Sequence, residues 1–387
     1  MAALTVPALV PAPARLGGRA AELRGDIREF LAAELADGTF EPRCDSWLSG
    51  WDEDFSRRLG TRGWLGMTIP QEYGGQGRTA LERYVVTEEL LAAGAPVAAH
   101  WVADRQTAPA LLRYGTPELR ERYLPGIARG ECYFAIGLSE PDAGSDLAAV
   151  RSRAERVDGG WEITGTKVWT SGAHHAHAFF VLARSSPPEG RNRHAGLSQF
   201  VVELSAPGVT IRPIRLITGE HHFNEVVMDG VFVPDDMVLG TIGEGWRQAT
   251  SELAFERSGS ERFLSTFPLL TALVDELVGQ GGAGQRELGR LVSRMWTLRR
   301  LSLSVAAALD RGEVPDVAAA LVKDLGTRLE NEITDTARLL TRTEPDPSAA
   351  GLPRLLADAV LHAPGFTLRG GTNEILRGVV ARAMGMR

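Results

Sequence analysis

The sequence predicts an α+β fold in which a helical segment, a small β domain and a helical bundle follow one another along the chain. Two observations predict it. At both ends of the chain, apolar residues recur every three or four positions, which is the spacing of an amphipathic helix. The middle consists of short segments rich in β-branched and aromatic residues and separated by turn residues, which is typical of strands. A length of 387 residues also fits two or three domains.

The first segment is predicted to be helical from residue 19 to residue 129. Its helical patterns include AAELRGDIREFLAAEL, ALERYVVTEELLAAG and PELRERYLPGIARG. We expect breaks at Pro70, at residues 74–77 and at Gly115, because proline and glycine interrupt helices. Residues 1–18 contain three prolines and no basic residue before their apolar stretch, so they predict a loose tail and not a signal peptide.

The second segment, residues 130–240, is predicted to be the β domain. Its strand patterns include WEITGTKVWTS, AFFVLARS, SQFVVEL and NEVVMDGVFVP, and residues 158–160 (Asp-Gly-Gly) predict a hairpin turn. Residues 241–387 are predicted to be a helical bundle. Leucine and alanine at a helical period in ELGRLVSRMWTLRRLSLSVAAALD and VAAALVKDLGTRLENEITDTARLL are best explained as bundle core.

Composition excludes several classes of protein. The 42 Lys and Arg against 49 Asp and Glu leave a net charge of −7, which argues against a nucleic-acid-binding protein. No apolar run approaches the roughly 18–20 residues that cross a bilayer. Cys44 and Cys132 supply neither a disulfide framework nor a CxxC metal site. The sequence contains no GxGxxG between a strand and a helix and no GxxxxGK[ST], which argues against Rossmann and P-loop enzymes. We therefore expect a cytoplasmic protein without a membrane span.

Four motifs resemble the acyl-CoA dehydrogenase family in order and spacing. They are LSEPDAGSDL at residues 138–147, GTKVWTS at 165–171, HFNEV at 222–226 and GGTNEILR at 370–377. The resemblance runs from about residue 24 to the end of the chain. It implies an N-terminal helical domain, a central β-barrel domain and a C-terminal four-helix bundle, which agrees with the three segments. It also implies FAD held between the β domain and the bundle, and FAD-dependent α,β-desaturation of an acyl thioester.

The resemblance implies seven cofactor-binding residues, which are Ile136, Leu138, Ser139, Trp169, Ser171, Thr372 and Glu374. Trp169 would pack on the flavin, and Ser171 would bond the ring nitrogen that receives the hydride. Thr372 would lie near the phosphates, because amides at a helix N-terminus favour an anion. Taken singly, the motif at residues 138–147 would be interpreted as a turn, Trp169 as a core residue and Thr372 as a helix cap.

The reaction needs a carboxylate that removes the α-proton of the thioester. Many members of the family carry this glutamate immediately before the C-terminal Gly-Thr, where this chain has Gly370. A second branch carries it on the first long helix of the C-terminal domain before an arginine, and this chain has Glu256 and Arg257 there. The resemblance therefore implies Glu256 as the base, since both positions converge in the fold. The alternative is a surface carboxylate paired with Arg257 or Ser260, with Glu252 and Glu261 as competing bases.

Other residues of the substrate site follow from the same resemblance. The Gly370 N–H, with a hydroxyl of the flavin ribityl chain, would hold the thioester oxygen. Ser145 would lie near the thioester, and Arg369 stands where many members have an aromatic over the substrate. A Glu256→Gly, Gly370→Glu exchange would be expected to restore part of the rate of a protein that lacks its base.

The histidines are not expected to bind metal. His174, His175 and His177 lack a surrounding pattern of carboxylate or cysteine ligands, so we expect a loop. We expect a structural or cofactor-adjacent role for the His221–His222 pair. His100 and Arg105 could border the acyl pocket, but core packing or a surface position is favoured.

The chain departs from the family between residues 258 and 300, where an Arg-x-x-Phe-Gly…Gln pattern for the adenine end of FAD is missing. This departure predicts a dimer or a pair of unlike subunits in place of the usual homotetramer. It also keeps open a non-catalytic partner subunit of a heteromer as an alternative function. A flavin monooxygenase or oxidase on the same fold is a further alternative, which Glu256 opposes. An electron-transfer flavoprotein is the expected electron acceptor, and the thioester carrier is either CoA or an acyl carrier protein.

Overall fold

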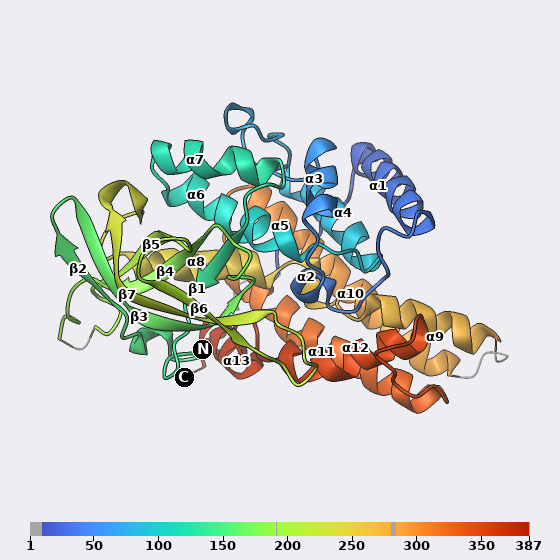
Figure 1. The fold of residues 1–387 in the computed structure, drawn as a ribbon. Coiled ribbons are helices and arrows are strands. Elements are labelled where there is room, and N and C mark those ends of the chain that lie inside the picture. The colour runs from blue at the N-terminus through green and yellow to red at the C-terminus, as the bar shows by residue number, and fades with distance from the viewer. Residues whose placement is uncertain (1–9, 191, 280–283, 387) are drawn as a thin grey trace, which may run out of the picture. The chain divides into compact units, whose positions relative to one another are not determined.

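The structure is a computed structural model that describes residues 10–190, 192–279 and 284–386; the side chains of residues 252–256 lie outside that description. Helices precede and follow a central sheet along the chain, so the predicted α+β class with helical ends and a β middle is confirmed (Figure 1). The helices before the sheet are α1 (Gly18–Ala36), α2 (Ser46–Ser49), α3 (Glu53–Thr61), α4 (Ala80–Ala92), α5 (Ala98–Val102), α6 (Ala108–Tyr114) and α7 (Pro117–Ala128).

Eight strands form one sheet. They are β1 (Phe134–Gly137), β2 (Arg153–Val157), β3 (Gly160–Ser171), β4 (Ala178–Arg184), β5 (Leu197–Glu203), β6 (Val209–Ile214), β7 (Phe223–Pro234) and β8 (Val238–Leu239). The strand order is β6-β7-β3-β2-β4-β5-β8, and β1 pairs with β4 in parallel. The long strands β3 and β7 are antiparallel, and their register shifts between Lys167 and Thr170. This shift is a β-bulge, which re-aims the side chains beside it.

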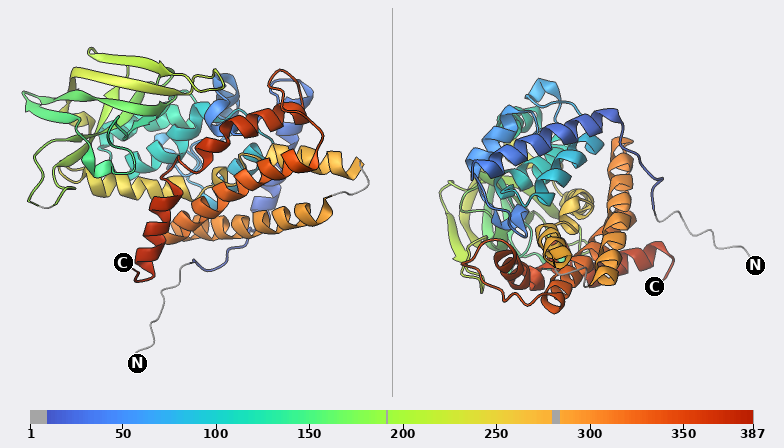
Figure 2. Two further views of the ribbon diagram at one scale, coloured as in Figure 1. Left: turned by 90° about the horizontal axis from the view of Figure 1, so that it is seen from below. Right: turned by 90° about the vertical axis from the view of Figure 1, so that its right-hand side faces the viewer.

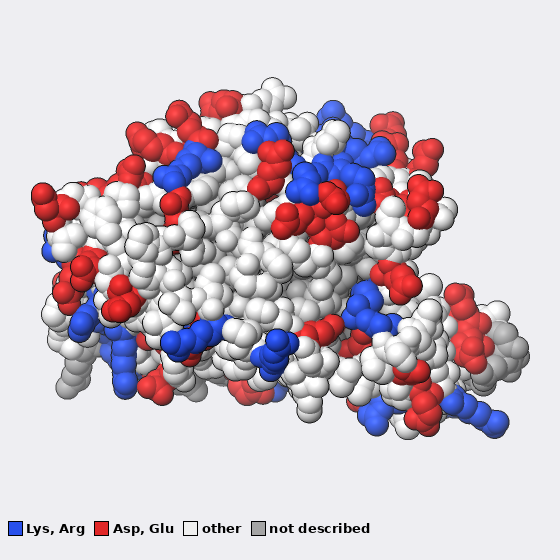
Figure 3. Space-filling view, viewed as in Figure 1, with Lys and Arg blue, Asp and Glu red and all other residues white. Residues whose placement is uncertain are grey.

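The remaining helices are α8 (Gly245–Arg257), α9 (Phe267–Gly279), α10 (Gln285–Asp310), α11 (Asp316–Leu340), α12 (Leu352–Phe366) and α13 (Asn373–Ala383). None of the described helices combines the length and the apolar character that crossing a membrane requires. On the face shown in Figure 3, acidic and basic side chains are interspersed.

The elements group into two compact units that cut across the three predicted segments. The helical unit comprises Met1–Gly50, Thr79–Val97 and Ala254–Arg387, and the sheet unit comprises Trp51–Arg78 and Ala98–Leu253. The helix α4 joins the helical unit because it packs against both α1 and α10. Its Glu88, which is buried, accepts hydrogen bonds from Arg24 of α1 and from Arg299 of α10.

Each unit has its own core. In the sheet unit, β4 and β5 are buried along almost their whole length, and fully buried aromatic residues fill the interior: Phe134, Phe179, Phe180 and Phe200. In the helical unit, the two longest helices, α10 and α11, lie side by side (Figure 2), and α11 also packs against α12 and α13. The segment between α12 and α13 carries the motif that begins at Gly370.

Candidate functional site

Trp169 has an unusual backbone in the sheet unit. Its φ is 59°, and Asp45 is the other non-glycine residue with positive φ in the described part of the chain. This conformation costs a bulky residue about 1–2 kcal/mol. It sits at the β3 bulge, and the indole is 56% exposed, with an edge contact to Phe223 at 5.7 Å between ring centroids. A strained bulge that turns a large ring outward suits a flat aromatic ligand.

The first two motifs meet at this bulge. The Val168 N–H donates to the Ser139 carbonyl at 2.9 Å, so Ser139 lies beside the strand that carries Trp169. Ser171 ends β3, and its hydroxyl-bearing side chain is half-buried. Ile136 on β1 pairs with Phe180 of β4, and Leu138 follows directly after that strand. The structure thus brings all five sheet-unit residues of the predicted flavin site to one region.

A buried ion pair that the sequence patterns do not predict links these two motifs. The Lys167 Nζ lies 2.7 Å from Glu140 Oε1 and also donates to the Leu182 carbonyl at 2.6 Å. The Glu140 carboxylate accepts the backbone N–H groups of Arg151 and Ser152 at 2.6 and 2.9 Å. Burial lowers the pKa of Lys167 to about 8, which Glu140 opposes. Burial would raise the pKa of Glu140, but Lys167 and the N–H donors hold it below its usual value. Both groups are therefore ionised at neutral pH.

Asn224 of the third motif holds the same strand from the β7 side. Its side-chain amide donates to the Thr170 carbonyl at 3.0 Å and accepts from His221 Nε2 at 2.7 Å. The His174 and His221 rings stack with centroids 3.9 Å apart. Burial, with His175 and His221 nearby, lowers the pKa of His174 to about 4, so its ring is neutral at pH 7. These imidazoles lie next to the end of β3 that carries Trp169.

In the helical unit, the loop before α13 carries Gly370, Gly371 and Thr372. Both glycines have positive φ, 67° and 86°, which glycine adopts without strain. Thr372 is the N-cap of α13, and its hydroxyl accepts the Ile375 N–H at 3.4 Å. The N-terminus of this 11-residue helix has the amides and the dipole that favour a phosphate.

Lys323 of α11 closes this loop from within the unit. It is fully buried, and its ammonium donates to the Thr367 carbonyl at 2.9 Å and to Asn373 Oδ1 at 2.7 Å. Burial, together with the positive charges of Arg262 and Arg369, lowers its pKa to about 7. One side chain therefore ties the start of the loop to the first residue of α13.

The end of α8 lies beside position 370. The Arg257 Nε donates to the Gly370 carbonyl at 3.2 Å. Glu256 precedes Arg257 in α8, and its side chain, like that of Glu252, lies outside the described residues. The Arg257 side chain therefore links the end of α8 to position 370, the other base position that the resemblance implies.

Position 370 has little room for a side chain. A Cβ there would lie 3.0 Å from the guanidinium of Arg262, which is buried, and the φ of 67° disfavours any residue with a Cβ. The structure therefore argues against the expectation that a glutamate moved to this position restores activity.

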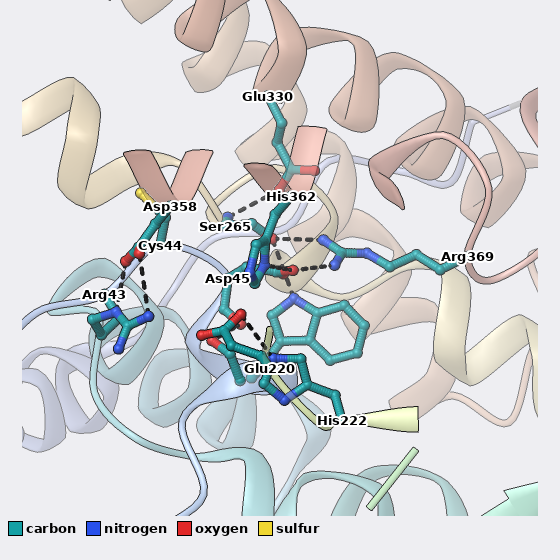
Figure 4. A network of polar contacts seen from close by, with 12 residues as sticks. Arg43, Cys44, Asp45, Glu220, His222, Ser265, Glu330, Asp358, His362 and Arg369 are labelled. Atoms are coloured by element: carbon teal, nitrogen blue, oxygen red, sulfur yellow. Dashed lines mark hydrogen bonds and ion pairs between the residues drawn. The ribbon is translucent and has the colours of Figure 1, made fainter. Parts of the chain in front are cut away.

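The other predicted site residues are placed as follows. Ser145 is exposed in the turn before β2, and Glu374 is exposed in the first turn of α13. Glu261, a competing base, is 1% exposed, and its Oε1 lies 3.8 Å from Arg262 Nε. Arg369 turns its guanidinium toward Asp45 in the interior of the helical unit (Figure 4).

Two side chains considered as pocket borders are buried in the sheet unit. His100 is 2.8 Å from the Ser56 hydroxyl, and Arg105 stacks on Trp101 with its guanidinium 5.0 Å from the ring centroid. Both positions are those of core packing.

Single residues of the chain have side chains whose chemistry suits the parts of FAD. An exposed, strained indole with a neighbouring hydroxyl suits the flavin ring, and the capped N-terminus of α13 suits phosphates. The missed residues, Glu140, Lys167 and Asn224, lie inside the quoted motifs. The sequence carries no clear signal for the ion pair, because Glu140 stands among other polar residues of its motif and lies 27 residues from Lys167.

Comparisons with known proteins support this interpretation. Family models match in three consecutive ranges: "Acyl-CoA dehydrogenase, N-terminal domain" at residues 19–131, "Acyl-CoA dehydrogenase, middle domain" at 135–231 and "Acyl-CoA dehydrogenase, C-terminal domain" at 274–385. The chain is 35% identical over 377 residues to acyl-CoA dehydrogenase IpdE1 of Mycobacterium tuberculosis, which covers 95% of this chain and 96% of IpdE1.

Two further similarities differ in their extent. The chain is 35% identical over 380 residues to acyl-CoA dehydrogenase FadE34 of Mycobacterium tuberculosis; the match covers 96% of this chain but spans half the length of FadE34. The solved structure named Tcur3481-Tcur3483 steroid ACAD has a TM-score of 0.85 and 30% identity, and the match covers 96% of this chain and 99% of that one.

Proposed function

Because this chain belongs to the acyl-CoA dehydrogenase family of flavoprotein oxidoreductases, we propose that it desaturates an acyl thioester with Glu256 as the base. The contact of Arg257 with the Gly370 carbonyl is the observation that carries the proposal. It puts the end of α8 beside the place where many relatives have their base, while Gly370 itself has no carboxylate. Of the two positions at which members of the family carry the base, this chain has a glutamate at position 256 and a glycine at position 370.

The chain's residues divide the reaction between them. The Glu256 carboxylate takes the α-proton, and the electron pair of that C–H bond forms the C-α=C-β double bond as the β-hydrogen leaves as hydride. When bound, FAD supplies the acceptor for this hydride. Among the described residues, no hydrogen bond engages the Gly370 N–H, so it remains able to donate to the thioester oxygen as negative charge develops there.

Turnover with thioesters tests the proposal. Purified FAD-loaded protein is incubated with an artificial electron acceptor and a panel of straight-chain, branched and steroid-sized acyl-CoAs. The last class is included because one relative is named a steroid ACAD. We expect a 2-enoyl thioester from at least one substrate. The same acyl groups on an acyl carrier protein decide the carrier, and an electron-transfer flavoprotein in place of the dye tests the acceptor.

FAD binding is expected to depend on Ser139, Trp169, Ser171 and Thr372. Replacing Trp169 with alanine removes the ring that is exposed at the bulge, and we expect the affinity for FAD to fall about tenfold. Fluorescence titration of the apoprotein with FAD measures this. Phe232→Ala is the matched control, since Phe232 is a similarly exposed aromatic residue of the same unit, on β7. A folded, colourless protein whose melting temperature does not change with excess FAD would contradict this proposal.

The biological unit is expected to be at least a dimer. The helical unit exposes several large apolar side chains: Val278, Val292, Trp296 and Leu339. Exposed apolar side chains that lie together are typical of an interaction surface, whereas single ones are normal. The name of the solved relative joins two proteins, Tcur3481 and Tcur3483, which favours an unlike partner as one candidate. Light scattering measures the mass; a clean monomer with FAD fully bound would rule the dimer out.

The same observation keeps a partner-subunit role as the second candidate. A chain that only completes a heteromer would show no desaturation alone or with FAD, and its Glu256 would be dispensable in the complex. The family's base position on α8 and the exposed indole of Trp169 both favour the catalytic role.

A further inference from the structure

Arg369 is held in the interior of the helical unit by a set of contacts that the sequence does not indicate. We propose that Arg369, Asp45 and Ser265 form a buried clamp that orients the Gly370 N–H toward the thioester oxygen. Arg369 is then a positioning residue that acts from behind the substrate site without touching the acyl chain. This inference rests on the proposed function, because it assigns Gly370 the role of hydrogen-bond donor to the thioester.

The guanidinium of Arg369 is engaged on several sides. Its Nη1 lies 2.5 Å from Asp45 Oδ2, and its Nη2 donates to the Ser265 hydroxyl at 3.1 Å (Figure 4). Its Cζ lies 4.5 Å from the centroid of the Trp47 ring and 5.0 Å from that of Phe366. Its side chain is only 14% exposed. Two hydrogen bonds and two aromatic contacts hold this side chain, although its Nε has no hydrogen-bond partner among the described residues.

Asp45 is itself fixed, so it can serve as an anchor. It is 1% exposed, its N–H donates to the Ser265 carbonyl at 2.8 Å, and its φ is 57°. Its Oδ2 also lies 3.0 Å from His362 Nδ1 of α12. Burial would raise the pKa of Asp45, but Arg369 and His362 hold it at about 2. The carboxylate is therefore ionised at any pH at which the protein is used, and the ion pair with Arg369 persists.

Ser265 connects the clamp to a third helix. Its hydroxyl also accepts the Trp47 Nε1–H at 3.2 Å, and its N–H donates to Glu330 Oε1 of α11 at 2.9 Å. Glu330 is fully buried, and burial raises its pKa to about 7. The partners of Arg369 are thus tied to the segment before α2, to α11 and to α12.

The clamp restrains the orientation of Gly370 through the planar peptide group that joins Arg369 to Gly370. The Gly370 N–H belongs to the peptide that begins at Arg369, so fixing Arg369 restricts the plane of that N–H. On the other side, Arg257 binds the Gly370 carbonyl at 3.2 Å. The Arg262 guanidinium occupies the space into which a side chain at position 370 would project. The peptide that carries the donor and the peptide that follows it are therefore both restrained.

The charge at position 369 matters because Asp45 is buried. An aromatic residue, which many members of the family have at this position, could not neutralise the Asp45 carboxylate. Removing one partner of a buried ion pair leaves an uncompensated charge, which is strongly destabilising. The guanidinium at position 369 and the carboxylate at position 45 are therefore expected to depend on each other.

Proton exchange isolates this role from the redox step. In a thioester whose C-β is replaced by sulfur, the base can remove the α-proton but no β-hydride is available. In D₂O the α C–H bond breaks, the proton goes to the base, and a deuteron returns to the α-carbon, so no electrons are consumed. The rate of this exchange, followed by mass spectrometry, measures how well the thioester oxygen is held as its charge develops.

We expect Arg369→Met to slow this exchange at least about tenfold, because small misplacements of a catalytic group cost up to about a hundredfold. FAD content and the dissociation constant of the analogue should stay near those of the parent, so that kcat falls and KM changes little. Arg369→Lys should recover only part of the rate, since an ammonium can pair with Asp45 but cannot reach Ser265 at the same time.

Two further variants make the test independent of folding. Arg354→Met removes another partly buried ion pair of the same unit, that with Asp358, and should leave exchange unchanged. Ser265→Ala removes the hydrogen bonds of the Ser265 hydroxyl to Arg369, Trp47 and Glu261 without unpairing a charge, and should slow exchange about two- to fivefold.

The outcomes separate the clamp from the proposed function. A parent protein that exchanges, together with Arg369→Met and Ser265→Ala variants that exchange equally fast, would overturn the clamp and leave the function standing. A parent that binds FAD and the analogue but takes up no α-deuterium would overturn the proposed function and the clamp with it.

Discussion

Glu256→Gln is expected to bind FAD and thioester as the parent does and to reduce its flavin at least about a hundredfold more slowly. Glutamine keeps the shape and the hydrogen-bonding atoms of the side chain but cannot accept the α-proton, and loss of a general base costs roughly 10²- to 10⁴-fold. Anaerobic stopped-flow mixing with substrate measures the rate of flavin bleaching.

The controls for this variant use carboxylates elsewhere. Glu287→Gln, on the exposed first turn of α10, should react as fast as the parent. Glu252→Gln tests the neighbouring carboxylate of α8. A Glu256→Gln protein that bleaches at the parent's rate would refute the assignment of the base.

Returning the carboxylate to position 370 is not expected to rescue the reaction. In a Glu256→Gly, Gly370→Glu protein, the new Cβ would lie 3.0 Å from the Arg262 guanidinium, and the new residue would have to adopt a φ of 67°. We expect less activity than in the Glu256→Gln protein, together with a lower melting temperature.

Lys167→Met is expected to lower the free energy of unfolding of the sheet unit by about 3–5 kcal/mol and to weaken FAD binding. The substitution leaves the Glu140 carboxylate buried without its counter-ion, at the junction of the two motifs that carry Ser139 and Trp169. Urea unfolding followed by fluorescence measures the stability.

A double variant distinguishes the ion pair from simple packing. Glu140→Gln combined with Lys167→Met removes both charges, so its loss should be smaller than the sum of the two single losses. The control is Arg153→Met, because Arg153 pairs with Glu155 on the surface of β2, where such a pair is worth less than about 1 kcal/mol. Additive losses in the double variant would show that the pair contributes nothing specific.

Much of the fold follows from sequence pattern, because periodicity reports local structure directly. The alternating and β-branched segments from residue 130 onward form the strands, and the leucine- and alanine-rich stretches form α10 and α11. The packing of α4 against the C-terminal helices could not be predicted from such local patterns. It depends on Glu88, whose arginine partners lie 64 and 211 residues away.

In the site, too, local motifs could be identified from the sequence, whereas contacts between residues far apart in the chain could not. The motif residues Ser139 and Trp169 lie close together, but the positive φ that turns the indole outward is a property of the bulge against β7. The direction of Arg369 could not be predicted, since Asp45 lies 324 residues away and no pattern links them.

A single anaerobic turnover tests the central claim most directly. FAD-loaded protein is mixed with each acyl thioester in the absence of oxygen, and the visible absorbance of the flavin and the thioester product are followed together. We predict that the flavin bleaches with at least one substrate and that one equivalent of 2-enoyl thioester forms for each flavin reduced. A protein with a full complement of FAD that stays oxidised with every thioester, while still binding them, would contradict the account.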